Sequence, residues 1–177
     1  MTETTDDGTP DRLNKLVTTT ATRLLGVTAA TSAAVSEEIL ADLVTGLGGA
    51  IGFLTHGDSK LVAIWPPNSE VPEDDGVTSI TSVPLLTGDV ATGELGFVGV
   101  QEWTPVETKA IKGIAALFAL TQARVDVEEQ LRYLAEHDDL TGLLNRRACL
   151  AHLDQRLAPG ELGPVCVLYL DLDRLKA

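Results

Sequence analysis

The end of the chain contains the side chains whose types and spacing most clearly suggest chemistry. Asp171 and Asp173 lie two positions apart at the end of an apolar run. On a β-strand, residues two apart point to the same face, so the two carboxylates would lie side by side. Hard oxygen ligands at a strand's end suit Mg²⁺ or Mn²⁺ ions that hold the phosphates of a nucleotide. The alternative is an acidic pair that is only solvated, and the two residues alone favour that alternative.

A second candidate is the stretch that reads DDLTGLLNRR. Its Asn145 can accept backbone N–H bonds at a helix start. Arg146 and Arg147 follow in the first turn, where positive charge opposes the helix dipole, so we expect an acidic partner for them. Asp138 or Asp139 is the candidate for that partner. The alternative is an ordinary acidic turn between two helices.

The hydrophobic periodicity predicts the elements that would position these residues. Helices are expected at Asp11–Leu25, Ser32–Leu47, Pro105–Glu136 and Asn145–Leu157. Strands are expected at Ala50–Leu54, Lys60–Trp65, Thr78–Leu86, Glu94–Val100 and Val165–Asp173. Pro84 indicates an edge position or the end of its strand. Thr104 and Glu107 predict a capping box at the start of the longest helix.

The longest predicted helix carries two apolar stripes. One is a heptad seam with Arg124 as its single polar member, and its residues are Leu117, Leu120, Arg124, Val127, Leu131 and Leu134. The other lies beside it over the first half of the helix, at Ile111, Ile114, Phe118 and Val125. A helix with two apolar flanks can pack on its own domain with one and on a partner helix with the other, which predicts a parallel homodimer. The alternative is one wide face that packs only on the core.

The DDLTGLLNRR stretch resembles the DxLTGLxNRR stretch that opens the GGDEF, or diguanylate cyclase, family, and Val167–Lys176 resembles that family's first strand, lDlDxFK. The order and separation of the two motifs also fit. The resemblance implies that Asp171 and the backbone carbonyl of Leu172 bind the metal ions, Mg²⁺ or Mn²⁺, and that Lys176 lies near the triphosphate of GTP. It implies a structural role for the motif residues Asp138, Leu140, Thr141, Asn145, Arg146 and Arg147. Leu175 departs from the family, which prefers Phe at that position.

The GGDEF resemblance covers only His137–Ala177, the opening part of such a domain. The guanine-binding Asn and Asp, the GG(D/E)EF loop and the RxxD product-inhibition site of the family have no counterpart in the sequence. Phosphoryl transfer depends on positioning and on charge neutralisation by metal ions, which one ligand site without a base pocket does not provide. We therefore expect that this chain binds no metal ion stably and makes no cyclic di-GMP. We also expect roughly the last forty residues to be poorly packed, or docked as a helix and strand against something else, because their apolar strand lacks its usual neighbours.

The region before the longest helix resembles a GAF domain in its order of elements and in two stretches, VPLL at 83–86 and GELGF at 93–97. The resemblance implies a sensor domain of the kind often found before a GGDEF domain, in some chains with an EAL phosphodiesterase domain after it. The interval Pro66–Gly76 is too short for the elements that usually wall the ligand pocket, so we expect a shortened domain without an enclosed pocket of about 300 Å³ or more. His56 is expected to be a solvated turn residue, and the identity of a ligand stays unknown.

Composition excludes several classes of function. Lys+Arg 13 against Asp+Glu 26 gives a net charge of -13, which disfavours nucleic acid as a partner. No apolar run approaches the roughly 18 residues of a membrane span, and the first residues lack the pattern of a signal peptide. A cytoplasmic localisation without membrane attachment is therefore expected. Cys149 and Cys166 show no metal-ligand spacing and are expected to be small buried hydrophobic residues in a reducing compartment.

The predicted fold class is α+β, with a shortened GAF-like antiparallel sheet flanked by helices, a long signalling helix and an incomplete GGDEF helix–strand unit. The expected organisation is a disordered acidic tail at 1–10, a GAF-like domain at 11–104, the signalling helix at 105–137 and the GGDEF start at 138–177. Three functions are compatible with this organisation. The first is a sensory and dimerisation module of cyclic di-GMP signalling without catalysis of its own. The second is the N-terminal part of a working diguanylate cyclase that makes cyclic di-GMP from two GTP, and the third is a GAF module that binds a small molecule.

Overall fold

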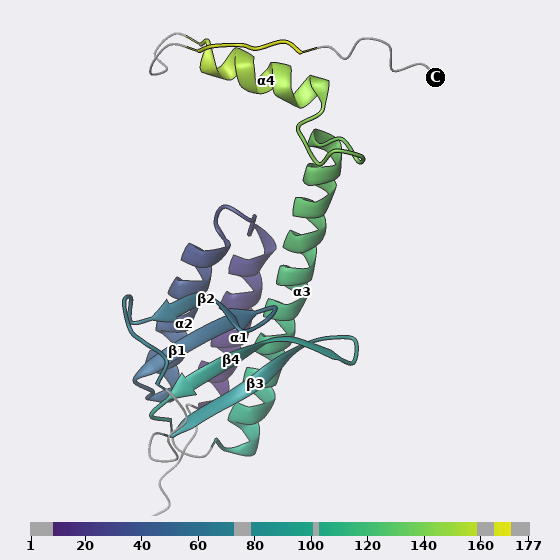
Figure 1. Ribbon diagram of the computed structural model, residues 1–177. Helices are drawn as coiled ribbons and strands as arrows, with labels where there is room; N and C mark the ends of the chain where they lie inside the picture. The colour runs from purple at the N-terminus through teal and green to yellow at the C-terminus, as the bar shows by residue number, and fades with distance from the viewer. Residues whose placement is uncertain (1–8, 73–78, 101–102, 159–164, 171–177) are drawn as a thin grey trace, which may run out of the picture. The chain divides into compact units, whose positions relative to one another are not determined.

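The computed structural model describes residues 9–72, 79–100, 103–158 and 165–170 of the 177. Its elements in chain order are α1 (Thr9–Leu25), α2 (Ser32–Leu47), β1 (Ile51–His56), β2 (Lys60–Trp65), β3 (Ile80–Thr87), β4 (Val90–Val98), α3 (Pro105–Glu136) and α4 (Arg146–Arg156) (Figure 1). The chain divides into two compact units, unit 1 (Met1–Glu129) and unit 2 (Gln130–Ala177). Helix α3 therefore begins in unit 1 and ends in unit 2.

The four strands of unit 1 form one antiparallel sheet in the order β2-β1-β4-β3. Two tight hairpins connect β1 to β2 and β3 to β4, and Gly57 and Gly88 in their turns have a φ of 62°, which glycine adopts without strain. Strand β3 lies at an edge of the sheet, so the position predicted from Pro84 is confirmed. Strand β4 begins at Val90 rather than at the predicted Glu94, because pairing with β3 continues up to the turn.

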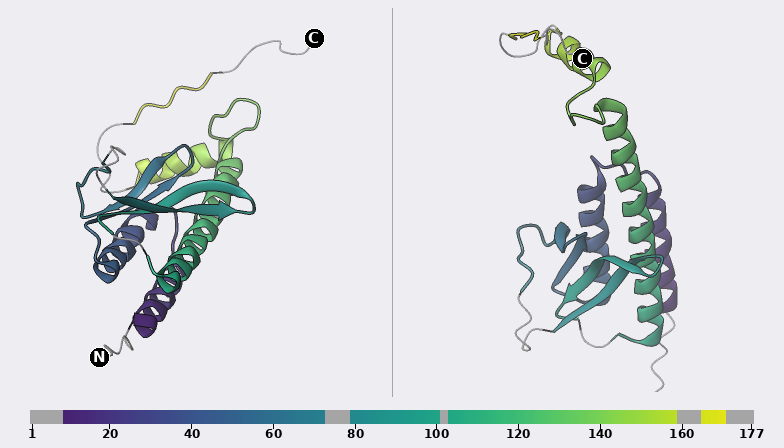
Figure 2. Two further views of the ribbon diagram at one scale, coloured as in Figure 1. Left: turned by 90° about the horizontal axis from the view of Figure 1, so that it is seen from below. Right: turned by 45° about the vertical axis from the view of Figure 1, so that its right-hand side comes forward.

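Helices α1 and α2 and the first part of α3 cover one face of this sheet (Figures 1 and 2). The core lies between these helices and the sheet. Its fully buried side chains include Leu40, Leu43, Leu54, Leu85, Leu95 and Phe97, each 0% exposed. Burial of apolar side chains of this size is the main source of stability in such a core. Unit 1 thus has an α+β fold, a four-stranded antiparallel sheet with helices.

The helix termini carry the caps that the sequence predicts. At the start of α3, Thr104 Oγ1 accepts a hydrogen bond from the Glu107 N–H at 3.3 Å, and the Thr104 N–H donates to Glu107 Oε2 at 2.8 Å. This confirms the capping box. At the end of α2, Gly48 has a φ of 73° and its N–H donates to the carbonyl of Val44. A left-handed glycine after the last helical residue stops a helix in this way.

Three expectations at the two ends of the chain need correction. Helix α1 begins at Thr9, inside the expected tail, whose residues 1–8 lie outside the described residues. Residues 165–170 of the predicted strand Val165–Asp173 do not form a strand, because the described residues provide no strand that pairs with them. Both cysteines are exposed rather than buried, since the described residues of unit 2 form no core around them. Ala148 is the one buried side chain among the described residues of unit 2, which confirms the expected poor packing there.

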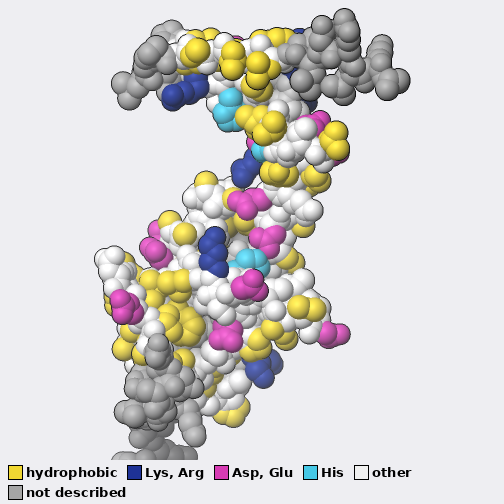
Figure 3. Space-filling model, in the orientation of Figure 1, with side chains coloured by type: hydrophobic (Ala, Val, Ile, Leu, Met, Phe, Trp, Pro, Cys, Tyr) yellow, Lys and Arg dark blue, Asp and Glu magenta, His cyan; other side chains and the backbone are white. Residues whose placement is uncertain are grey.

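The surface of unit 1 reflects the acidic composition. On the face shown in Figure 3, Asp and Glu side chains outnumber Lys and Arg side chains, and hydrophobic side chains lie between them. Within the described residues, no helix combines the length and the apolar character that crossing a membrane requires.

Candidate functional site

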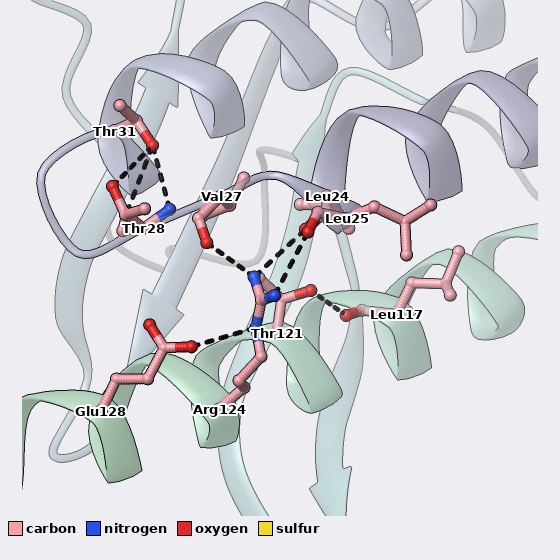
Figure 4. A network of polar contacts seen from close by, with 9 residues as sticks. All are labelled: Leu24, Leu25, Val27, Thr28, Thr31, Leu117, Thr121, Arg124 and Glu128. Carbon is pink, nitrogen blue, oxygen red and sulfur yellow. Dashed lines mark hydrogen bonds and ion pairs between the residues drawn. The ribbon is translucent and has the colours of Figure 1, made fainter. Parts of the chain in front are cut away.

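Arg124 joins helix α3 to the end of helix α1 (Figure 4). Its guanidinium donates hydrogen bonds to three backbone carbonyls, those of Val27 at 2.6 Å, Leu25 at 3.2 Å and Leu24 at 3.4 Å. The last carbonyls of a helix have no partner within the helix and carry a partial negative charge, which a cation compensates. Arg124 therefore caps the C-terminus of α1 from another helix. We name this set of contacts the Arg124 junction.

The residues around the Arg124 junction hold the connection between α1 and α2 in one conformation. The Thr28 N–H donates to Thr31 Oγ1 at 3.0 Å, and the Thr31 N–H donates back to the Thr28 carbonyl at 3.1 Å. Val27 is only 3% exposed. On α3, the Arg124 Nε lies 3.9 Å from Glu128 Oε1, a long and exposed ion pair that adds little. The three carbonyl contacts are thus the main polar contacts of Arg124.

Helix α3 has one buried and one exposed apolar stripe. Ile111, Ile114, Phe118 and Val125 are 5% exposed or less. On the seam, Leu120 is 71% exposed, Val127 55%, Leu131 62% and Leu134 53%, whereas Leu117 is partly buried against the core. One stripe of the helix thus packs on its own domain and most of the seam does not, whereas packing of the seam on a partner helix stays a prediction. The lone polar member of the seam, Arg124, is bound within its own chain.

A groove lies where α1 meets the seam of α3. It has a volume of about 350 Å³ and is lined by Ala21, Leu24, Leu25, Leu117, Leu120, Thr121 and Arg124. Leu25, the last residue of α1, is 76% exposed. The groove is therefore largely apolar and open to a partner.

The DDLTGLLNRR stretch forms a hydrogen-bonded connection between α3 and α4. The carboxylate of Asp138 accepts hydrogen bonds from the Thr141 hydroxyl at 2.8 Å and from the Thr141 N–H at 3.0 Å. These bonds, the hydroxyl first, lower the pKa of Asp138 below its ordinary value of 3.8. Gly142 has a φ of 68° and its N–H donates to the Asp138 carbonyl at 2.8 Å. The tight turn thus requires a glycine at that position and an acceptor at Asp138.

Asn145 links the two helices that this connection joins. Its Oδ1 accepts from the Ala148 N–H at 3.0 Å, so it caps α4 as predicted. Its Nδ2 donates to the Ala135 carbonyl at 2.8 Å, and its backbone N–H donates to the Glu136 carbonyl at 2.7 Å. The same residue therefore satisfies the start of one helix and the end of the other.

The predicted acidic partner of the two arginines is not present among the described residues. Arg147 donates to the Ala135 carbonyl at 3.3 Å, and the carboxylate of Asp138 is occupied by Thr141. The carbonyl end of α3 provides the negative potential that a carboxylate would otherwise supply. Leu140, another motif residue, is 93% exposed, so its burial among the described residues does not explain its place in the motif.

The predicted nucleotide-binding residues cannot be placed in this structure. Asp171, Leu172, Asp173 and Lys176 lie outside the described residues. Within the described ranges, no three His, Cys, Asp or Glu side chains gather closely enough to hold a metal ion.

His56 is a residue whose role the sequence did not reveal. It ends strand β1 rather than lying in the turn, and its Nε2 lies 2.8 Å from Asp126 Oδ2 on α3. The His56 side chain is only 25% exposed, and its Nδ1 is buried without a hydrogen-bond partner. The contact ties the β1–β2 hairpin to the helix.

The sheet face opposite the helices carries a hollow of about 570 Å³. Phe53, Leu61, Val71 and Ile80 supply apolar lining, and polar groups such as those of Thr55 and Glu94 lie among them. This volume exceeds the roughly 300 Å³ of a typical ligand pocket. Residues 69–72 supply one wall of the hollow, which is open to solvent rather than enclosed, so the expectation that the shortened domain lacks an enclosed pocket of this size stays a prediction.

Comparison with known proteins relates the chain to bacterial signalling proteins. No family model matches it. An uncharacterized protein of Mycobacterium tuberculosis, Rv1354c, is 45% identical over 224 residues, which cover 97% of this chain and 36% of that protein, and an uncharacterized protein of Mycobacterium bovis, Mb1389c, gives the same values. The chain thus spans about a third of these relatives' length. Because the 224 aligned residues exceed the 177 of this chain, the relatives contain residues in this region that have no counterpart here.

A further relative is named as a signaling protein. An uncharacterized signaling protein of Caulobacter vibrioides is 43% identical over 97 residues, 52% of this chain and 12% of that protein. The chain is therefore a homologue of the mycobacterial proteins and, over part of its length, of this Caulobacter signaling protein.

Proposed function

We propose that this chain is a sensory and dimerisation module of cyclic di-GMP signalling. In this proposal residues 11–104 are a shortened GAF-like sensor, residues 105–137 are the signalling helix, and residues 138–177 are the start of a GGDEF domain. The chain itself acts without catalysis, as a homodimer formed through the helix. The resemblances to GAF and GGDEF domains and the similarity to a signaling protein support this assignment.

The observation that carries the proposal is the two-sided helix α3. One stripe is fixed in the core of the sensor, with Ile111, Ile114 and Phe118 each 1% exposed. Most residues of the heptad seam on the other side are exposed. The segment that follows α3 in the chain and connects it to α4 is held by hydrogen bonds of Asp138 and Asn145. A helix held by a sensor domain and available to a partner can relay a state of the first to the second when it has two alternative arrangements.

Sedimentation equilibrium over a concentration series, in a buffer with a thiol reductant, tests this proposal. We expect the chain to pass from monomer to dimer as its concentration rises. Leu131→Glu places a carboxylate in the seam and should weaken the dimer at least hundredfold, about 2.8 kcal/mol. Leu86→Glu, at a residue of β3 that is 51% exposed, is the matched control and should leave the dimer unchanged. A mass that stays monomeric at every concentration contradicts the proposal.

A second candidate function is small-molecule binding by the GAF-like region. The hollow of about 570 Å³ on the open sheet face favours it. A thermal-shift series with cyclic nucleotides tests it, because a ligand at 100 times its Kd adds about 2.7 kcal/mol of stability to the folded state. Ile80→Trp, which would fill the hollow, should abolish any shift. No shift with any compound speaks against this candidate.

The enzymatic alternative is the N-terminal part of a diguanylate cyclase. In that case Asp171 and the carbonyl of Leu172 would hold Mg²⁺ or Mn²⁺, and Lys176 would lie near the GTP triphosphate, as the resemblance implies. Incubation with GTP and either metal, followed by chromatography, distinguishes this alternative from the module without catalysis. Metal-dependent formation of cyclic di-GMP by this chain would overturn our assignment.

A further inference from the structure

The end of strand β1 lies between the hollow on the open sheet face and helix α3. Side chains along a strand alternate between the two faces of its sheet. Phe53 and Thr55 line the hollow. Leu54 is buried in the core under the helices, and His56 contacts Asp126 of α3. Two neighbouring residues, Thr55 and His56, therefore face the hollow and the helix respectively.

The hollow and the His56 contact share the β1–β2 hairpin. Ser59 in its turn and Leu61 in β2 also line the hollow. Thr55 is bound to strand β4 as well, since its Oγ1 accepts a hydrogen bond from the Glu94 N–H at 3.0 Å. A molecule that packs in the hollow would therefore contact the same short segment that positions the His56 imidazole.

The contact between His56 and Asp126 is placed where α3 leaves the core. The His56 side chain is 25% exposed and its Nδ1 is buried, so the imidazole is packed while its Nε2 lies 2.8 Å from Asp126 Oδ2. Val125 is the last buried residue of α3, and residues 126–135 are exposed. Asp126 thus marks the point where the helix leaves the core of unit 1.

Arg124 holds α3 at the same level from another side. Its guanidinium binds the carbonyls at the end of α1 (Figure 4). Residues two apart on an α-helix point about 200° away from each other, so Arg124 and Asp126 fix α3 from nearly opposite sides. The contact of Asp126 with His56 is the one of these two that involves the sheet, and the sheet carries the hollow.

We propose that the end of β1 couples the hollow to α3, with His56 as the positioning residue. A small molecule with an apolar surface packs on Thr55 and Leu61, orders the hairpin and holds His56 more firmly against Asp126. The next turn of α3 becomes more stable, because a molecule that binds only the folded state stabilises what it orders. This inference rests on the proposed sensor with a ligand in the hollow, and it specifies how the sensor acts on the signalling helix.

Hydrogen exchange of the full chain tests the coupling, with an indole ring attached inside the hollow as the probe. Ile80→Trp and Val71→Trp fill the hollow from β3 and from residues 66–72 respectively. Each should slow exchange at the amides of residues 127–129 at least about threefold. Leu86→Trp, on β3 and outside the lining of the hollow, is the matched control and should leave this exchange unchanged.

Unchanged or faster exchange in the filled variants would overturn the proposal. Circular dichroism during urea unfolding shows whether each variant folds. If one of the two fails to fold, the other decides, because they fill the same hollow from opposite walls.

The role of His56 is tested by removing its contact. His56→Ala and Asp126→Ala should each speed exchange at residues 127–129 about fivefold, and in either background Ile80→Trp should no longer slow it. Asp89→Ala, which removes an exposed carboxylate from the turn of the other hairpin, is the matched control and should preserve the effect of Ile80→Trp. A full effect of Ile80→Trp in the Asp126→Ala background would show that the hollow acts on α3 by another route, and would overturn the role of His56.

The failure of this inference and the failure of ligand binding give different results. If the filled variants slow exchange through Asp126 but no compound shifts the thermal transition of the wild type, the coupling is supported and the ligand-binding candidate is not. If a compound shifts the transition but neither that compound nor the filled variants change the exchange at residues 127–129, the inference alone fails. A chain that is monomeric at every concentration leaves this inference intact, because the coupling acts within one chain.

Discussion

Unit 1 and unit 2 are stabilised in different ways. In unit 1, helices and strands enclose a core whose largest side chains, such as Phe97 and Phe118, are 1% exposed or less. In the described part of unit 2, Ala148 alone is buried, while Leu140, Tyr169 and Leu170 are each more than 80% exposed. The order in unit 2 instead depends on the local hydrogen bonds around Asp138 and Asn145.

This difference shows what a short motif can specify by itself. A turn and two helix caps need only neighbouring residues, so the DDLTGLLNRR stretch can form its hydrogen bonds without a core. Apolar burial needs partners from several elements, and it contributes far more stability than a cap does. We therefore expect substitutions to change the stability of unit 1 by more than that of unit 2. We also expect the two changes to be detected by different probes.

The largest effect is expected from Phe118→Ala in unit 1. Removing this buried ring should lower the free energy of unfolding by about 3–5 kcal/mol. Both tryptophans of the chain, Trp65 and Trp103, lie in unit 1, so their fluorescence during urea unfolding measures this change. Leu140→Ala in unit 2 is the control and should change the same transition by less than about 0.5 kcal/mol. Equal effects of the two substitutions would contradict the comparison.

Two glycine substitutions in unit 1 test the role of close packing in its stability. A Cβ at Gly96 would collide with the ring of Phe53, so Gly96→Ala should destabilise unit 1 by about 1–3 kcal/mol through overpacking. A Cβ at Gly113 in α3 would meet nothing within 4 Å, and Gly113→Ala should stabilise the helix by about 0.5–1 kcal/mol. Tryptophan fluorescence measures both. Two changes of the same sign would refute the packing argument.

In unit 2, Asn145→Ala removes a cap without touching a core. It should cost about 1 kcal/mol of local stability, seen as faster hydrogen exchange at the Ala148 amide. The tryptophan-detected unfolding of unit 1 should not change. Gln155→Ala, which truncates another amide on α4, is the control and should leave the exchange of Ala148 as it is. A loss of unit 1 stability in Asn145→Ala would show that the two units unfold together.

The smallest effect is the pH dependence of the Asp138 turn. The folded state lowers the pKa of this carboxyl below 3.8, so the unfolded state binds the proton more readily. The contribution of Asp138 is therefore fully present above pH 3.8 and is lost as the pH falls through the lower folded pKa. The protection of the Thr141 amide, meaning its exchange rate relative to that of an unfolded chain at the same pH, should fall in that acidic window, and Asp138→Asn should remove the dependence. A carboxyl that titrates at or above 3.8 by NMR would contradict this account.

The sequence predicted those features that depend on neighbouring residues. Ser32–Leu47 and Lys60–Trp65 agree with α2 and β2 residue for residue, since periodicity and turn residues bound them closely. The cap at Asn145 was likewise predicted from the sequence, because Asn is one of the residues that helices prefer at the N-cap position.

Features that depend on partners far away in the sequence were not predicted. His56 pairs with a residue 70 positions away and Arg124 with carbonyls about a hundred positions away, and nothing in their local sequence marks either contact. The predicted strand from Val165 onward has strong β character, but a strand forms only with a partner to share its hydrogen bonds. The exposure of the cysteines was not predicted for a related reason. A small apolar side chain is buried only where other apolar side chains pack around it.

Those two cysteines make the chain easy to label and easy to cross-link. Cys149 and Cys166 both lie in unit 2 and both are exposed, so a maleimide dye would attach there and leave unit 1 unmodified. In air, the same thiols can oxidise and join two molecules covalently. A dimer that survives an excess of dithiothreitol is therefore one held by noncovalent contacts, and its lifetime can be followed by exchange between dye-labelled and unlabelled chains.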